Sequence, residues 1–308
     1  MKKAIITGPT GAVGIALIRE LIAQNVEVLA VCRVGSKRIG DIPKHEKVHI
    51  LECDLADLTG LKTETEYDAF YHFGWDGTFG ADARNDMSSQ IRNIGYTIDA
   101  VHAAARCGCK KFIGAGSQAE YGRVDGLLTA LTPTFPENGY GMAKLCAGEM
   151  SRVECEKLGL EHVWTRILSI YGPHDGSRTM IMSTIGKLLQ GEIPALTAGE
   201  QMWDYLYAAD VGRAMYLIGE KGIHGRIYPI GSGQMRPLKE YIEILRDSID
   251  PSLRLGLGEI PYGKKQVMHL CADISELRED TGFEPAYSFE RGIRETIDWC
   301  RMERNENN

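Results

Sequence analysis

Tyr140 and Lys144 lie four residues apart in a segment that is expected to be helical. Residues separated by four positions share one face of a helix, so the phenol and the ammonium should be neighbours. A fixed positive charge favours the phenolate, which lets a tyrosine act as an acid or base near neutral pH. The same spacing is common on ordinary helix surfaces, so this proton-transfer hypothesis depends on what the rest of the chain supplies.

A glycine-rich run lies between the first expected strand and the first expected helix. Gly8 permits a tight turn, Gly11 lets the backbone approach a pyrophosphate, and Gly14 lets the helix pack against the strand. The helix N-terminus adds free N–H groups and the positive end of a dipole. The run predicts a dinucleotide site. Its expected contacts are Gly8, Thr10, Gly11, Ala12, Val13 and Gly14.

The end of the second expected strand indicates which dinucleotide binds. Sites for NAD usually place a carboxylate there to bond the ribose, whereas here Cys32 is followed by Arg33, with further basic residues nearby. A missing anion and added cations suit a 2′-phosphate, which favours NADP(H), with NAD(H) as the alternative. Asp54, followed by Leu55, ends the third expected strand. Asp54 is expected to accept from the adenine amino group or to cap a helix.

Short apolar runs alternate with helical patterns through the first half of the chain. Strands are expected at 4–7, 28–31, 48–51, 69–73, 111–114 and 161–168, and helices at 13–22, 86–105, 140–156 and 289–301. This alternation predicts an α/β fold with a Rossmann-like, doubly wound parallel sheet. Residues 1–173 are expected to form the dinucleotide-binding domain, with later returns near 202–230. Residues 174–308 are expected to form mainly a smaller C-terminal substrate-binding lobe.

The composition is that of an ordinary globular protein, with 44% hydrophobic and 25% charged residues among 308. The net charge of −7 gives no electrostatic reason to expect nucleic acid or an anionic membrane as a partner. No apolar run could span a bilayer or serve as a signal peptide, so a cytoplasmic location is expected. The eight cysteines include Cys107 and Cys109 but form no zinc-like set, so no metal site is expected.

With these motifs the chain resembles the extended short-chain dehydrogenase/reductases, a family of nucleotide-sugar epimerases, dehydratases and reductases. The likeness covers nearly the whole chain. Besides the glycines and the Tyr140–Lys144 pair, it rests on Ser117 after the fifth strand, on Tyr171-Gly172-Pro173 and on the later Asp204-Tyr205 motif. The resemblance implies that Tyr140 is the acid/base on a sugar hydroxyl or keto oxygen. It also implies that Lys144 bonds the nicotinamide ribose and lowers the pKa of the tyrosine, and that Ser117 orients the sugar oxygen.

The resemblance also implies the substrate contacts. The segment Phe73-Gly74-Trp75 follows the fourth expected strand, where the family lines the nicotinamide side of its cleft. An arginine and an asparagine that touch the nucleotide-sugar in relatives are replaced here by Trp203 and Ser169, and Arg178 is a candidate replacement cation. The expected substrate site consists of Trp75, Gln118, Ser169, Arg178 and Trp203.

One departure from the family narrows the reaction. The 4,6-dehydratases carry Asp-Glu directly after the Ser/Thr, whereas this chain has Gln118 and Ala119. Glu120 stands one residue further and would point to the other face if the strand continued. We therefore expect a nucleotide-sugar oxidoreductase that is either a 4-keto-sugar reductase or a C4 epimerase.

Other interpretations stay open. Relatives commonly dimerise through the helices expected at 86–105 and 140–156, which implies a homodimer. The alternative functions are a non-catalytic NAD(P)-binding regulatory protein and a reductase of a non-nucleotide carbonyl substrate.

Overall fold

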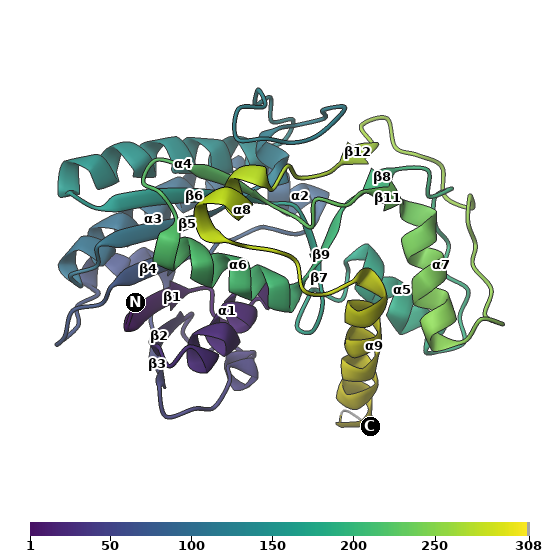
Figure 1. Ribbon diagram of the computed structural model, residues 1–308, viewed down its shortest axis with the longest axis horizontal. Helices are drawn as coiled ribbons and strands as arrows, with labels where there is room; N and C mark the ends of the chain where they lie inside the picture. The colour runs from purple at the N-terminus through teal and green to yellow at the C-terminus, as the bar shows by residue number, and fades with distance from the viewer. Residues whose placement is uncertain (307–308) are drawn as a thin grey trace.

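A seven-stranded sheet forms the centre of the computed structural model, which describes residues 1–306. Its order is β10-β6-β5-β4-β1-β2-β3, and all neighbouring strands are parallel (Figure 1). The chain builds outwards from β1 to β3 and then, from β4, in the opposite direction, which confirms the predicted doubly wound fold. The strands are β1 Lys3–Thr7, β2 Glu27–Cys32, β3 Val48–Glu52, β4 Ala69–His72, β5 Lys111–Ser117, β6 Glu161–Ile167 and β10 Ile227–Ile230.

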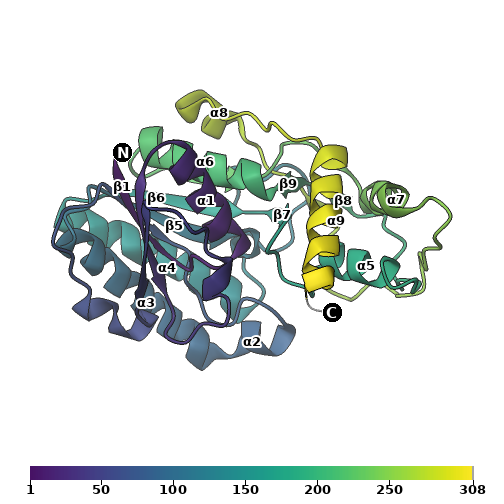
Figure 2. The same cartoon turned by 90° about the horizontal axis from the view of Figure 1, so that it is seen from below.

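Helices cover both faces of this sheet (Figure 2). On one face lie α1 (Ala12–Ala23) and α6 (Ala208–Lys221), and on the other α3 (Met87–Arg106) and α4 (Gly139–Leu158). Burial on both faces explains why the strands read as continuous apolar runs rather than as alternating patterns. The two cores include Leu17, Val211 and Met215 on the first face and Val101, Phe112 and Cys155 on the second.

A second group of helices lies beyond the carboxyl ends of the strands (Figure 1). It consists of α5 (Met180–Leu188), α7 (Leu238–Ile249) and α9 (Phe289–Glu306), which pack on one another. Their shared core is separate from those of the sheet and is rich in aromatic residues. It includes Tyr171, Ile185, Tyr241, Phe289 and Ile293.

Small sheets and short helices complete the architecture. Strand β7 (Ser169–Tyr171) pairs with β9 (Tyr205–Tyr207), which places Ser169 beside Tyr205. Strand β8 (Met202–Trp203) lies between β11 (Arg236–Pro237) and β12 (His269–Leu270). The short helices are η1 Ile39–Asp41, η2 Leu55–Gly60, α2 Ala81–Asn85, η3 Gln118–Glu120 and α8 Ser275–Thr281. Within residues 1–306, no helix is both long and apolar enough to cross a membrane.

Element boundaries depart from the expectations by a few residues. Strand β5 continues to Ser117 because its last residues pair with β6 as far as Ile167. Helix α4 begins at Gly139, where the side chain of Asn138 accepts a hydrogen bond from the N–H of Gly141. Helix α9 extends to Glu306, beyond its expected end at 301, and this last part of the helix consists mostly of polar residues.

Candidate active site

A cleft of about 620 Å³ opens at the carboxyl ends of β1, β4, β5 and β6. It brings together most of the residues that the sequence singled out, although they come from distant parts of the chain. The residues expected at the site that line it are Gly8, Thr10, Gly11, Ala12, Val13, Gly14, Phe73, Gly74, Trp75, Ser117, Gln118, Tyr140, Lys144, Ser169 and Trp203. Four expected residues do not line it, namely Arg33, Asp54, Leu55 and Arg178.

The glycine-rich turn leaves room for a ligand at the N-terminus of α1. Gly8 has a φ of +69°, and a Cβ there would lie 2.7 Å from the backbone nitrogen of Gly74. A Cβ on Gly14 would lie 2.4 Å from the carbonyl oxygen of Gly8, so both glycines are sterically required. Gly11, by contrast, has room for a Cβ, whose nearest neighbour would be the carbonyl oxygen of Gly8 at 3.7 Å, an ordinary van der Waals contact. No side chain caps α1, so this turn fits a pyrophosphate.

The loop after β2 differs from the expectation for a 2′-phosphate site. Arg33 is exposed and lies outside the cleft wall. Two carboxylates from the end of β3 approach the same loop, where Asp54 accepts from the N–H of Val34 at 3.1 Å and Glu52 from that of Gly35 at 2.8 Å. Asp54 does occupy an N-cap position, but its side chain bonds the β2 loop rather than its own helix. The end of β2 therefore has no carboxylate of its own, but two carboxylates from the end of β3 lie beside the loop that follows it.

Leu55 packs against Gly74 and does not itself line the cleft. A Cβ on Gly74 would lie 2.8 Å from a methyl group of Leu55. The N–H of Gly74 donates to Oγ1 of Thr7 at 3.2 Å, and the Thr7 hydroxyl also bonds Nδ1 of His72 at 2.9 Å. The hydroxyl can donate one hydrogen bond and accept two, so the direction of its bond with His72 follows from the tautomer of the imidazole. Nε2 of His72 is buried and has no hydrogen-bond partner within the described chain.

Arg38 bridges the two sides of the cleft near the glycine turn. Its Nη2 donates to the carbonyl oxygen of His174 at 3.0 Å, and its Nε donates to Asp41 at 2.9 Å. His174 has a φ of +66°, which is uncommon for a residue with a side chain. Both Arg38 and His174 line the cleft. No local sequence pattern indicates this contact, because 136 residues separate the two partners.

Ser117 and Tyr140 are buried next to each other at the inner end of the cleft, each 7% exposed. Burial raises the pKa of the Tyr140 phenol, while a hydrogen bond with Ser117 and the charge of Arg84 lower it and the charge of Glu120 raises it. The net direction is upward, so burial outweighs the favourable contacts in the protein on its own. The cation that lowers the tyrosine pKa here is Arg84, which the sequence analysis did not single out.

Lys144 is turned away from the phenol. Its Nζ donates to the carbonyl oxygen of Ala115 at 2.6 Å, lies 3.6 Å from the ring centre of Trp75 and lies 5.9 Å from that of Tyr140. Burial lowers the pKa of Lys144 to about 7, although Glu120 acts in the opposite direction. Burial therefore disfavours the ammonium form of this lysine.

The loop that follows β4 is fixed to helix α3 by two buried amides. Gln90 accepts from Nε1 of Trp75 at 3.0 Å and donates to the carbonyl oxygens of Gly77 and Ala83. Asn93 pairs with both backbone groups of Asp76, at 3.0 and 2.8 Å. Both amide side chains are 1% exposed. This anchoring holds residues 75–85 as a fixed wall of the cleft.

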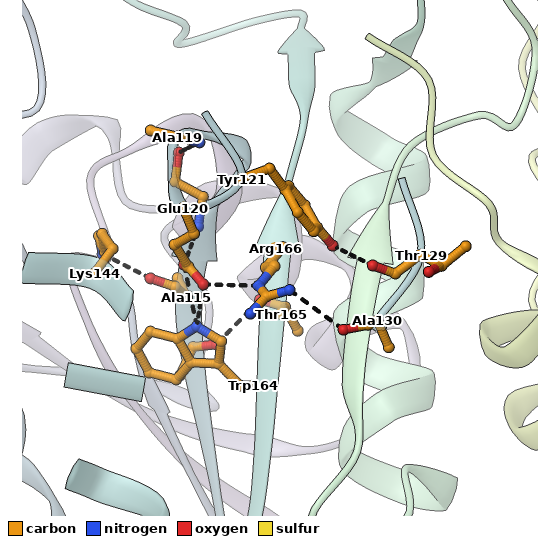
Figure 3. Close-up of polar contacts among 12 residues, drawn as sticks. Ala115, Ala119, Glu120, Tyr121, Thr129, Ala130, Lys144, Trp164, Thr165 and Arg166 are labelled. Atoms are coloured by element: carbon orange, nitrogen blue, oxygen red, sulfur yellow. Dashed lines mark hydrogen bonds and ion pairs between the residues drawn. The ribbon is translucent and has the colours of Figure 1, made fainter. Parts of the chain in front are cut away.

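Glu120 lies on the short helix η3 that follows β5, so the strand does not continue to this residue. The strand ends at Ser117, and η3 turns the chain so that Glu120 accepts from the N–H of Ser117 at 2.8 Å. Its carboxylate also accepts from Nε of Arg166 at 2.8 Å and from Nε1 of Trp164 at 3.2 Å (Figure 3). The side chain is fully buried and does not line the cleft. Glu120 therefore supports Ser117 from behind.

Trp164 fills a slot between β5 and α4. A Cβ on Gly114 would lie 2.1 Å from its indole ring, and a Cβ on Gly148 would lie 2.7 Å from it. A Cβ on Gly116 would lie 2.3 Å from both Nε1 of Trp164 and Oε1 of Glu120. Three glycines thus make room for one indole beneath the cleft floor.

The outer end of the cleft is lined by aromatic and polar groups. Nε1 of Trp203 donates to Oγ of Ser169 at 2.8 Å. Asp175, the carboxyl group that lines the cleft, accepts from the N–H of Gly176 and the hydroxyl of Thr179. Burial raises the pKa of Asp175 to about 6. Arg178 is exposed outside the cleft, so the structure does not place this expected cation on the substrate side.

A dinucleotide cradle, a buried Ser–Tyr–Lys set and a second lobe over the strand ends together define an enzyme of the extended short-chain dehydrogenase/reductase type. Residues 4–231 match the model of the NAD dependent epimerase/dehydratase family. The chain belongs to this family, whose members in the comparisons below act on nucleotide-sugars.

Individual relatives are distant but match over nearly their full length. The dTDP-glucose 4,6-dehydratase of Xanthomonas campestris pv. campestris is 24% identical, over 96% of this chain and 92% of that protein. Among solved structures, the UDP-N-acetylglucosamine 4-epimerase from Methanobrevibacter ruminantium M1 has a TM-score of 0.88 at 23% identity, covering 98% and 99% of the two chains. A dTDP-glucose 4,6-dehydratase from Streptomyces venezuelae with NAD and TYD bound has a TM-score of 0.86 at 23% identity, covering 99% and 98%. These structural likenesses establish the fold.

Proposed function

We propose that the protein is a nucleotide-sugar oxidoreductase that acts as a C4 epimerase or as a 4-keto-sugar reductase. One observation carries the proposal. Ser117, Tyr140 and Lys144 line a single cleft with the glycine cradle, while the acid that follows Ser117 most closely, Glu120, is buried outside that cleft. With Gln118 and Ala119 in the two preceding positions, no carboxylate stands next to Ser117 to eliminate water.

The reaction depends on proton transfer by the chain's own groups. Tyr140 gives a proton to, or takes one from, a sugar oxygen, and Ser117 holds that oxygen by a hydrogen bond. Lys144 contributes its ammonium to the ribose of the cofactor. A bound nicotinamide dinucleotide would supply the hydride-transfer capacity that these residues lack. The buried position of Tyr140 excludes water from the reacting groups.

We propose that NAD(H) is the cofactor. Related structures with NAD bound include the Streptomyces venezuelae dehydratase and a UDP-glucuronic acid 4-epimerase from Bacillus cereus. Within this chain, the exposed position of Arg33 and the carboxylates of Glu52 and Asp54 support the same choice. The preference for NADP(H) drawn from the sequence has no support from the relatives. A thermal-shift series with NAD and NADP tests the choice, since the preferred dinucleotide raises the melting temperature more.

We propose that α5, α7 and α9 form the substrate lobe and that the substrate is a nucleotide-sugar. The Methanobrevibacter ruminantium epimerase was solved with UDP-N-acetylmuramic acid and a Thermotoga maritima UDP-glucose 4-epimerase with UDP-glucose. Trp203, Ser169 and Tyr205 supply aromatic and hydroxyl groups at the outer end of this cleft. Melting temperatures measured with a panel of UDP- and dTDP-sugars would identify the nucleotide.

We propose a homodimer formed through α3 and α4. These helices expose apolar side chains that a second copy of the chain could cover, namely Ile91, Met142, Met150 and Val153. Met150→Glu should convert a dimer into a monomer in light scattering without unfolding the chain. Scattering that shows a monomer for the unchanged protein contradicts the proposal.

One experiment separates the epimerase from the reductase. An epimerase regenerates its cofactor, so the purified protein should release bound NAD when it is denatured. A reductase should contain little nucleotide and should consume added reduced cofactor. Tyr140→Phe should abolish either activity. Full turnover by Tyr140→Phe favours a non-catalytic role for the site, and saturation by small aldehydes with no protection by nucleotides favours the non-nucleotide carbonyl reductase.

A further inference from the structure

Arg84 lies against the phenol of Tyr140, on the side of the cleft formed by the anchored loop. Its guanidinium carbon is 4.7 Å from the centre of the Tyr140 ring, which is closer than the 5.9 Å of Lys144 Nζ. Both Arg84 and Tyr140 line the cleft. A guanidinium over the face of a phenol is attracted to the ring and to any negative charge that develops on it.

The position of Arg84 is fixed by contacts on three sides. Its Nε donates to the carbonyl oxygen of Thr78 at 2.7 Å, and Gln90 holds the preceding residue through the carbonyl oxygen of Ala83. Asn85 accepts from the N–H of Gly139, the first residue of α4. A Cβ on Gly139 would lie 3.0 Å from the carbonyl oxygen of Arg84, so the two backbones are in close contact. Arg84 is therefore built into the wall beside Tyr140.

The two cations near Tyr140 differ in how permanent their charge is. The ammonium of Lys144 contacts the carbonyl oxygen of Ala115 and the ring of Trp75, and burial lowers its pKa. An arginine stays charged at every pH at which the protein is folded. The groups that face Tyr140 are Arg84 from α2, Ser117 from β5, Glu120 from η3 and Lys144 from α4. Among them Arg84 is the one with a constant positive charge.

We propose that Arg84 is a positioning residue whose permanent charge stabilises the phenolate of Tyr140 against the cost of its burial. This role rests on the proposed function, because it assumes that Tyr140 is the acid/base. The family resemblance implies that Lys144 alone lowers the pKa of Tyr140. Here Arg84, in the segment after β4, takes over part of this role.

The direct test follows the ionisation of Tyr140 itself. Carbon-13 NMR of tyrosine-labelled protein reports the charge at Cζ, and the Tyr140 signal is assigned by its absence in Tyr140→Phe. The midpoint of this titration should rise by about one pH unit or more in Arg84→Gln, as expected for loss of an opposite charge within ~4–6 Å. Arg84→Lys should lie between the two. Arg92→Gln, which removes an exposed arginine on α3, should leave the midpoint unchanged.

Equal midpoints in wild type and Arg84→Gln, or signals that both stay protonated up to alkaline unfolding, overturn the proposal. If Arg84→Gln does not fold, the same comparison is made with Arg84→Met, which also removes the charge, and an unchanged midpoint with an unchanged pH profile of turnover overturns the proposal. The proposed function fails separately, if Tyr140→Phe retains full turnover. If Tyr140→Phe loses activity and Arg84→Gln leaves the titration midpoint of Tyr140 unchanged, only the proposed role of Arg84 is contradicted.

Discussion

The carboxylate of Glu120 and the guanidinium of Arg166 form an ion pair of 2.8 Å, with side chains 0% and 4% exposed. Burial raises the pKa of Glu120, while Arg166, the N–H of Ser117 and Trp164 each act to lower it. Arg166 also stacks on the ring of Tyr121, at 4.6 Å from its centre. The pair lies directly behind the strand end that presents Ser117, so it connects the stability of the fold to the geometry of the site.

Breaking this pair should destabilise the protein strongly. Glu120→Gln leaves the guanidinium of Arg166 buried without a counter-charge, which typically costs about 3–5 kcal/mol. Urea unfolding measures the loss. The double variant Glu120→Gln/Arg166→Met should recover part of it, because the uncompensated charge is gone. A single variant as stable as wild type would show that Glu120 is not ionised in the folded protein.

Lys144 should make stability depend on alkaline pH. Its folded pKa is about 7, below the usual value of 10.5, because burial disfavours the ammonium. Between these values the unfolded chain holds a proton that the folded chain has released, so the free energy of unfolding rises with pH across this window. Lys144→Met should remove up to about 1.4 kcal/mol per pH unit of that slope. Parallel curves for the two proteins from pH 7 to 10 would contradict the assignment.

His72 should contribute to acid sensitivity. Burial, with the charge of Lys144 in second place, lowers its pKa from 6.5 to about 3. The unfolded chain binds this proton near pH 6.5 and the folded chain does not, so stability should fall as the pH drops from 6.5 toward 3. His72→Phe keeps a ring against Phe112 and should give a shallower decline in urea unfolding between pH 7 and 4. His162 has a similarly low pKa and is present in both proteins, so its contribution cancels.

Asn93 should hold the loop of residues 75–85 in place. Asn93→Leu removes both bonds to the backbone of Asp76, and each such hydrogen bond typically contributes about 0.5–1.5 kcal/mol. The backbone amide of Asp76 should then exchange its hydrogen at least tenfold faster. Ser88→Ala, at an exposed position of α3, serves as the matched control. Protection of Asp76 that is unchanged in Asn93→Leu would mean that other contacts hold the loop.

Sequence patterns within short segments predicted those features of the fold and the site that are formed by residues close together in the chain. The glycines at 8, 11 and 14, the Tyr140–Lys144 pair and the order of strands and helices all follow from neighbours in the chain. The position of Glu120 depends on a capping box that follows Ser117, which the apolar run of the strand does not reveal. The carboxylates near the β2 loop and the guanidinium of Arg84 come from other elements. Their positions depend on tertiary packing, which a spacing in one segment does not encode.

The slot around Trp164 has an evolutionary consequence. Gly114 and Gly148 can each gain a side chain only after the indole has been replaced by something smaller, whereas a Cβ on Gly116 would also lie 2.5 Å from the carbonyl oxygen of Thr165. The reverse change, from a small residue to tryptophan, requires positions 114 and 148 to be glycine beforehand. Substitutions at these two positions and at Trp164 are therefore permitted in one order and not in another. Lineages of this chain should keep or lose the tryptophan together with Gly114 and Gly148, whereas Gly116 should stay glycine in either case.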